Sequence, residues 1–262
     1  MQFFFKFIYK IRRIIILNCH KWIRNIFWLL FCFGRFKNYC LTFLPFQNLA
    51  PYKVFHWHDN ARLFLGMLEN NAAHVFIKTE NNFNLMDNEE RMNKLFYEAL
   101  PNNCSKIVNT FSYYRKKILL FEYINGRTLK DYFLNPTPKI CLAFFFNELI
   151  VIIDTLYRLK LIHRDITPSN LIIHYDNRDI PTNIKLIDFT FCVMAGDTYI
   201  DSKLDKDTLA SLGKRLKPKK FLWDDAFSAF EILKEIETRT GQSFPSYRER
   251  FRKRIGRLTH KY

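Results

Sequence analysis

The chain has 262 residues and a formal net charge of +16, with 48% hydrophobic and 17% aromatic residues. This length allows one globular domain with an appendage or two small lobes around a cleft, and the hydrophobic content excludes a disordered chain. The six cysteines show neither paired metal-ligand spacing nor the density of a secreted disulfide scaffold. We therefore expect reduced thiols in a cytosolic setting.

Residues 1–50 form a basic leader without any acidic residue, since the first acid of the chain is Asp59. Single basic residues interrupt its apolar clusters, and no uncharged run approaches the ~18 residues of a membrane-spanning helix. If residues 3–25 are helical, apolar side chains surround one basic stripe, which consists of Lys6, Lys10, Arg13, Lys21 and Arg24. This pattern predicts an amphipathic helix on an anionic membrane, at its cytoplasmic face.

Other interpretations of the leader differ in what its apolar side chains contact. The helix would instead pack on the protein's own catalytic domain if these side chains belong to a core. A nucleic-acid-binding arm rarely carries so much continuous apolar surface, so we expect no nucleic-acid partner. A signal peptide is disfavoured because charges interrupt the apolar region and no small-residue cleavage site follows it.

The composition becomes ordinary from Pro51 onward, and Pro45 and Pro51 are predicted to mark a linker. Apolar runs bounded by Asp, Asn and Glu turn signals predict three strands, at residues 53–57, 62–68 and 74–79. A helix is expected next, over residues 87–100. Together these elements predict a small β-rich lobe.

The remainder of the chain is predicted to be mainly helical. An apolar strand ending in a turn occupies residues 118–129, and the nearly all-round apolar pattern of residues 139–160 is typical of a buried central helix. Two apolar strands at 171–174 and 184–187 surround a polar turn, which predicts a hairpin. A last helical pattern covers residues 223–236.

The most informative stretch is His-Arg-Asp-Ile-Thr-Pro-Ser-Asn-Leu-Ile-Ile at 163–173, followed by Lys-Leu-Ile-Asp-Phe-Thr at 185–190. Its carboxylate at Asp165, amide at Asn170 and carboxylate at Asp188 resemble the catalytic centre of protein-kinase-like phosphotransferases. Phosphoryl transfer requires a group that accepts or orients the hydroxyl proton, and oxygen ligands for Mg²⁺. The resemblance therefore implies ATP and Mg²⁺, with Asp165 as the base and Asn170 and Asp188 as metal ligands.

The same resemblance implies roles for residues nearer the amino terminus. Lys78, at the end of a Val-Phe-Ile-Lys strand, would contact the α and β phosphates and pair with a glutamate of the following helix. Glu89 fits this glutamate better than Glu90, although an acid in a first helical turn is also favoured by the helix dipole alone. Backbone groups from Glu122 to Ile124 would hydrogen-bond the adenine edge of ATP.

Three further residues are implied to support the catalytic loop. His163 and Arg164 would pack under the loop and tether neighbouring backbone or acidic groups. Asp225 would be a buried scaffold acid that hydrogen-bonds the loop backbone, unless Asp224 and Asp225 merely cap a helix.

The expected fold is α+β and resembles a two-lobed protein kinase. A small β-rich N-lobe would occupy residues 51–124 and a mainly helical, shortened C-lobe residues 125–262, after a basic amphipathic helical leader over residues 1–50.

Departures from the protein-kinase pattern bear on the acceptor. The turn at 58–61 lacks a glycine-rich loop, so either its backbone amides contact the phosphates without glycine or the nucleotide is held more loosely. Thr167 stands where Ser/Thr protein kinases usually have a lysine, and Thr190 replaces the glycine after Asp188-Phe189. No Ala-Pro-Glu follows, and few residues follow the Asp225 helix, so a peptide-docking segment is expected to be absent.

A compact kinase fold with a membrane-seeking leader resembles the bacterial lipopolysaccharide-core kinases, the Kdo and heptose kinase family. This resemblance implies ATP-dependent phosphorylation of a sugar hydroxyl on a lipid-linked glycan, with the protein peripherally associated with the cytoplasmic face of the inner membrane. The basic stretches at 214–220 and 248–257 would face anionic lipid or phosphorylated glycan, or would be solvated. The alternatives are a Ser/Thr protein kinase acting on a membrane-proximal protein and a nucleotide-binding pseudokinase.

Overall fold

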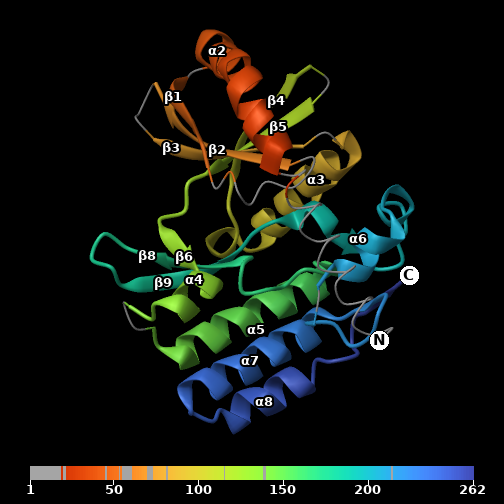
Figure 1. The fold of residues 1–262 in the computed structure, drawn as a ribbon. Coiled ribbons are helices and arrows are strands. Elements are labelled where there is room, and N and C mark those ends of the chain that lie inside the picture. Colours follow the sequence, from red (N-terminus) through yellow and green to blue (C-terminus); the bar gives the residue numbers. More distant parts are fainter. Residues whose placement is uncertain are drawn as a thin grey trace, which may run out of the picture. The chain divides into compact units, whose positions relative to one another are not determined.

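The computed structural model describes residues 19, 22–44, 46–52, 54, 61–69, 73–80, 82–114, 116–137, 140–213 and 215–262. The chain divides into two compact units, one formed by Met1–Asn82 with Asn109–Tyr123 and the other by Phe83–Val108 with Ile124–Tyr262. The first unit is built on a β-sheet and the second is mainly helical (Figure 1). The expected α+β fold, with a β-rich and a mainly helical part, is confirmed.

The first unit contains a five-stranded sheet in the order β1-β2-β3-β5-β4, apart from the first two residues of β4. Its strands are β1 (Phe46–Pro51), β2 (Ala61–Leu68), β3 (His74–Glu80), β4 (Ile107–Tyr113) and β5 (Lys116–Glu122). The pairs β1–β2, β2–β3 and β3–β5 are antiparallel. Buried and half-buried residues alternate along β2, so one face of the sheet lines a core.

The first strand lies in a different place from the one that we expected. β1 begins at Phe46, inside the expected leader and linker, because Phe46 and Leu49 are buried in the core of the first unit. Pro51 ends this edge strand, a position that tolerates a residue without an N–H. Of the strand expected at 53–57, Val54 lies in a 3₁₀ turn, and the other four residues lie outside the described residues.

The described part of the leader also packs on the sheet instead of forming a separate region. Residues 22–31 are helical, and α2 covers Phe33–Phe43. Phe36 and Cys40 are buried in one core with Phe64 of β2, and the rings of Phe36 and Phe64 lie 4.9 Å apart. The helical residues 22–31 and 33–43 therefore follow the alternative interpretation, a helix packed on the protein's own domain, whereas residues 46–50 belong to strand β1. Residues 1–18, which include most of the expected membrane helix, lie outside the described residues.

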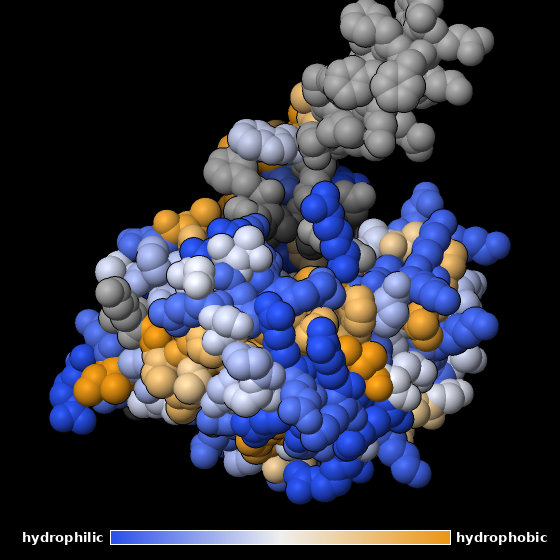
Figure 2. Space-filling model, turned by 90° about the horizontal axis from the view of Figure 1, so that it is seen from below, coloured by the Kyte–Doolittle hydropathy of each residue, from blue (hydrophilic) through white to orange (hydrophobic). Residues whose placement is uncertain are grey.

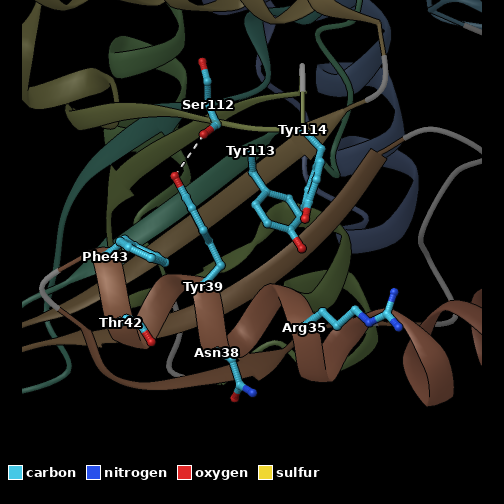
Figure 3. Close-up of a pocket in the computed structure, with 8 residues that line it drawn as sticks. All are labelled: Arg35, Asn38, Tyr39, Thr42, Phe43, Ser112, Tyr113 and Tyr114. Atoms are coloured by element: carbon cyan, nitrogen blue, oxygen red, sulfur yellow. Dashed lines mark hydrogen bonds between the residues drawn. The ribbon is translucent and has the colours of Figure 1, made fainter.

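A cavity of about 610 Å³ lies between α2 and residues 112–114 in the first unit. The Tyr39 hydroxyl donates a hydrogen bond to the Ser112 carbonyl oxygen at 3.1 Å, and the ring of Tyr113 lies 4.7 Å from that of Tyr39 (Figure 3). Arg35 and Phe43 also line this cavity. The cavity thus combines aromatic walls with one cationic side chain.

The second unit is built around α5 (Leu142–Arg158), whose residues are buried on most sides. The central helix expected at 139–160 is confirmed. Figure 1 shows α5, α7 and α8 stacked in that order, with the β6–β8–β9 sheet next to α5. The helices of this unit are α3 (Phe83–Ala99), α4 (Leu129–Leu134), α5, α6 (Lys206–Ser211), α7 (Asp225–Thr240) and α8 (Pro245–Arg252).

Short strands and turns connect these helices. β8 (Leu171–Tyr175) and β9 (Pro181–Leu186) pair antiparallel, as the sequence predicted, and β6 (Gly126–Thr128) completes their sheet. The other two-stranded pairs are β7 (Leu161–Ile162) with β10 (Val193–Met194), and β11 (Leu222–Trp223) with β12 (His260–Lys261). Three 3₁₀ turns are η2 (Pro101–Asn103), η3 (Phe189–Phe191) and η4 (Asp201–Lys203).

Helix α3 differs from its prediction in two respects. It begins at Phe83, four residues before the expected start at Asp87. It also belongs to the second unit instead of the small β-rich lobe, because Met92 and Phe96 are buried in the core that surrounds α5.

None of the helices among the described residues is both long enough and apolar enough to cross a membrane.

The packing of α2 can be tested with two phenylalanines of the same helix. Phe36→Ala is expected to lower the free energy of unfolding by about 3–5 kcal/mol, because the ring is buried. Phe43→Ala is the matched control, since that side chain is 71% exposed and its loss is expected to change stability by less than about 0.5 kcal/mol. Urea denaturation measures both, and equal effects would contradict the burial of α2.

Candidate active site

The loop between β7 and β8 carries the predicted base. The side-chain amide of Asn170 donates hydrogen bonds to the backbone oxygen and to Oδ2 of Asp165, both at 2.9 Å. The backbone N–H of Gly213 donates to Asp165 Oδ1 at 3.3 Å. Both carboxylate oxygens of Asp165 are therefore held, while the residue stays only half-buried. This is the arrangement required of a carboxylate that must meet an incoming hydroxyl in a fixed orientation.

The second predicted metal ligand follows β9 directly. The backbone N–H of Ile187 donates to the Asn170 carbonyl oxygen at 3.0 Å, so the chain enters Asp188 beside the catalytic loop. Asp188 has φ 67° and ψ 69°, in the left-handed region. A non-glycine residue in this region costs about 1–3 kcal/mol, which the surrounding contacts must offset. The hydroxyl of Thr190 lies 2.7 Å from Asp188 Oδ1 and is one of these contacts.

The side chains of Asn170 and Asp188 suit a magnesium ion. Because the Asn170 amide nitrogen donates both of its hydrogen bonds to Asp165, the amide oxygen is left to act as a ligand. Among the described residues, no group of three or more His, Cys, Asp and Glu side chains could hold a metal ion. Mg²⁺ does not need such a cage, since it usually binds one or two carboxylates and completes its octahedron with water and substrate phosphates.

Glu89 of α3 belongs to the same site. Its side chain is buried, and Oε2 lies 2.8 Å from the Thr190 hydroxyl, which also contacts Asp188. A hydroxyl has one proton, so Thr190 can donate to only one of the two carboxylates at a time. Since α3 begins at Phe83, Glu89 lies beyond the first turn, and the helix dipole does not account for an acid there.

The residues expected to bind ATP in the first unit lie on two neighbouring strands. Lys78 is buried in β3, opposite Leu63 of β2 and Leu119 of β5. Its contact with phosphate and its pairing with Glu89 stay predictions.

The expected adenine-binding segment begins at Glu122, the last residue of β5. The next backbone N–H, that of Tyr123, donates to the His74 carbonyl oxygen at 3.3 Å and is therefore engaged in the sheet. Contacts of Glu122 and Ile124 with adenine stay predictions.

Asp225 at the start of α7 supports the backbone of the catalytic loop. Its carboxylate accepts hydrogen bonds from the backbone N–H groups of His163 at 2.6 Å and Arg164 at 3.1 Å. The neighbouring Asp224 is the residue that caps α7, because it accepts from the N–H of Phe227. Burial raises the pKa of Asp225 to about 7, although the two N–H donors lower it.

Arg164 belongs to a buried charge network. It has φ 67°, donates from Nε to the Phe191 carbonyl oxygen at 2.6 Å, and pairs through Nη1 with Asp201. The other oxygen of Asp201 lies 2.5 Å from Nε2 of His260 in β12. Removing one partner of a buried ion pair costs about 3–5 kcal/mol, so the pair of Arg164 with Asp201 holds the loop strongly.

His163 connects the loop to the apolar core. Its Nε2 lies 3.2 Å from the Ile187 carbonyl oxygen, and its ring meets that of Phe189 edge-on at 4.9 Å. The Phe189 ring in turn lies 5.2 Å from Phe96 of α3. The segment after Asp188 is also tied to α3 by Asn88, whose amide donates to the carbonyl oxygens of residues 190 and 192.

Several residues of this site were not identified from the sequence. Asn88, Asp201 and His260 act through contacts between distant segments, for which the sequence offers no local signal. Thr190 was noted only as a departure from a glycine. Gly213 offered a weak signal as an isolated glycine: it has φ 71°, and a Cβ at this position would lie 2.8 Å from the Arg164 carbonyl oxygen.

The titration of Asp225 predicts a pH-dependent stability. Its pKa in the folded protein, about 7, lies above the value near 4 of an unperturbed aspartate. The stability contributed by protonated Asp225 is therefore complete below about pH 4 and is lost as the pH rises through about 7. Urea denaturation should show wild-type stability falling relative to Asp225→Asn across this window, by up to a few kcal/mol.

A difference in stability between the wild type and Asp225→Asn that stays constant over this pH range would contradict the assignment.

Alanine substitutions at two glycines distinguish the effect of the close approach of Gly213 to the catalytic loop from the effect of backbone strain at a positive φ. Gly196 also has a positive φ, of 85°, but a Cβ there would meet nothing within 4 Å. Ala at either position costs about 1–2 kcal/mol in strain. Only Gly213→Ala should also displace the loop and lower the rate of phosphoryl transfer at least about tenfold. Equal rates for Gly213→Ala and Gly196→Ala would refute a role of Gly213 in the loop.

Comparison with known proteins agrees with this geometry. A model of the protein kinase domain matches residues 61–236. A probable cyclin-dependent serine/threonine-protein kinase of Dictyostelium discoideum is 31% identical over 108 residues, which are 37% of this chain and 7% of that protein. Serine/threonine-protein kinase mrck-1 of Caenorhabditis elegans is 34% identical over 73 residues, 27% of this chain and 4% of that protein.

A third relative is a probable serine/threonine-protein kinase, the KIN1 homolog of Encephalitozoon cuniculi. It is 37% identical over 73 residues, which are 27% of this chain and 12% of that protein. The chain thus spans only a small part of the length of these curated relatives. Because the domain model covers more than half of the chain and includes Asp165, Asn170 and Asp188, the chain belongs to the protein kinase domain family.

Proposed function

We propose that this protein is an ATP-dependent kinase that phosphorylates a serine or threonine hydroxyl of a protein. The observation that carries the proposal is the double role of Asn170. Its side chain orients the Asp165 carboxylate, and its carbonyl oxygen accepts from the residue that precedes Asp188. One residue thus joins a base to a metal ligand, as phosphoryl transfer requires. The serine/threonine-protein kinases among its relatives support a protein acceptor.

Residues of the second unit have different roles in the proposed reaction. Asp165 accepts or orients the proton of the attacking hydroxyl. Asn170 and Asp188 would hold Mg²⁺, which would neutralise charge on the triphosphate. Thr190 positions Asp188 and links it to Glu89.

A second acceptor is a sugar hydroxyl on a lipid-linked glycan such as a lipopolysaccharide core, at the cytoplasmic face of a membrane. Thr167 supports this candidate, because its side chain has no positive charge at the position where serine/threonine kinases usually have a lysine. The backbone oxygen of Thr167 accepts from the N–H of Asn170 at 2.9 Å, so this residue belongs to the catalytic loop itself. The relatives favour the protein acceptor over this one.

The two acceptors can be compared in one experiment. Purified protein is incubated with radiolabelled Mg·ATP and either a mixture of dephosphorylated proteins or lipid-linked core glycan. Label is expected on serine or threonine of the proteins. Label on the glycan alone would establish the second acceptor. No label on either acceptor would indicate a pseudokinase, and a rise of the melting temperature with Mg·ATP would then show that it still binds nucleotide.

The role of the base is tested by Asp165→Asn, which preserves the shape of the side chain. Transfer is expected to fall about 10²–10⁴-fold, the usual contribution of a general base. Asp207→Asn applies the same substitution to an exposed aspartate of α6 and should leave the rate unchanged. Wild-type transfer by Asp165→Asn would eliminate the proposed mechanism.

A further inference from the structure

The helix over residues 22–31 presents apolar side chains both to a core and to solvent. On its inner side, the ring of Trp28 lies 6.0 Å from Phe36 and 5.7 Å from Phe64, within the core of the first unit. The same helix also carries six large apolar side chains that are between 43% and 72% exposed: Trp22, Ile23, Ile26, Phe27, Leu30 and Phe31. A surface helix of a globular protein normally places polar residues on its solvent side.

Four of the exposed residues form a continuous stripe that has a basic residue near each end. Ile23, Phe27, Leu30 and Phe31 follow the spacing of three and four that keeps residues on one face of a helix. Backbone hydrogen bonds from Cys32 to residue 28 and from residue 36 to Cys32 continue the helical pattern into α2. The exposed Arg24 and Arg35 therefore fall on this stripe, three residues before Phe27 and four residues after Phe31. We call the four apolar residues of the stripe, together with Arg24 and Arg35, the outer face.

Other parts of the described chain do not repeat this concentration. Exposed apolar residues such as Leu134, Val151 and Ile180 come from separate elements of the second unit. Figure 2 shows one face of the molecule on which hydrophilic residues predominate and hydrophobic residues are interspersed among them. Scattered apolar residues are normal on a protein surface, whereas a contiguous patch marks an interaction site.

We propose that the outer face binds the surface of a membrane that contains anionic lipids. Aromatic and aliphatic side chains would enter the boundary between headgroups and acyl chains, and Arg24 and Arg35 would meet lipid phosphates. The charge of this region supports a membrane over a second copy of the chain: no acidic residue precedes Asp59, so two outer faces would bring together only like charges.

The surroundings of Arg35 also suit a lipid headgroup. Arg35 lines the cavity between α2 and residues 112–114, together with Phe43, and Figure 3 shows its side chain at one end of that cavity. We expect a lipid phosphate to reach the guanidinium from this hollow.

Vesicle binding by the full chain tests the proposal. The triple variant Ile23→Gln, Phe27→Gln and Leu30→Gln removes apolar area from the outer face and retains residues that favour a helix. Its partitioning onto phosphatidylcholine vesicles with about a quarter phosphatidylglycerol should fall at least about tenfold from the wild-type value in co-sedimentation. The matched control, Leu134→Gln, Val151→Gln and Ile180→Gln, removes exposed apolar area from the second unit and should bind as the wild type does.

The charged part of the outer face is tested separately with Arg24→Gln and Arg35→Gln. This double variant should lose affinity for anionic vesicles but not for pure phosphatidylcholine vesicles, and added salt should reduce the difference. Failure of the wild type to bind anionic vesicles, or equal binding by the wild type and the Ile23, Phe27 and Leu30 variant, would overturn the proposal. A wild-type dimer in the absence of lipid that this variant converts to a monomer would assign the outer face to a second copy instead.

Discussion

The catalytic loop of the second unit depends on two buried carboxylates that come from other segments. Asp225 accepts hydrogen bonds from two successive backbone N–H groups of the loop, those of His163 and Arg164. Asp201 forms an ion pair with the side chain of Arg164. A buried carboxylate is costly unless it is paired or hydrogen-bonded, and both of these are. The geometry of Asp165, the next residue, follows from this anchoring.

The same anchoring offsets backbone strain at the site. Arg164 and Asp188 both have φ 67°, a conformation that non-glycine residues rarely adopt. At Arg164, the hydrogen bonds to Phe191 and Asp201 offset the cost of this strain. At Asp188, the contact with Thr190 does so. Strained residues of this kind gather at functional sites because the surrounding structure fixes them.

The sequence predicted those parts of the fold whose signals are local. The buried helix α5, the β8–β9 hairpin and the spacing of Asp165, Asn170 and Asp188 follow from apolar periodicity and short motifs. Strand β1 and helix α2 were assigned to a leader because they lie in a stretch without acidic residues, and the apolar, basic composition of that stretch is the same whether it enters a core or a membrane. Only contacts with distant strands distinguish the two, and for Phe36 these contacts come from β2. The pairing of β12 with β11, which also lacks a local sequence signal, brings His260 to Asp201.

The position of His260 in the chain has a consequence for protein synthesis. The ribosome makes the catalytic motif long before it makes β12, which pairs with β11 and carries His260 to Asp201. A nascent chain that ends before residue 260 contains Asp165, Asn170 and Asp188, but Asp201 then lacks its contact with His260. The order of translation therefore delays the complete set of contacts around Asp201 and Arg164 until β12 has emerged.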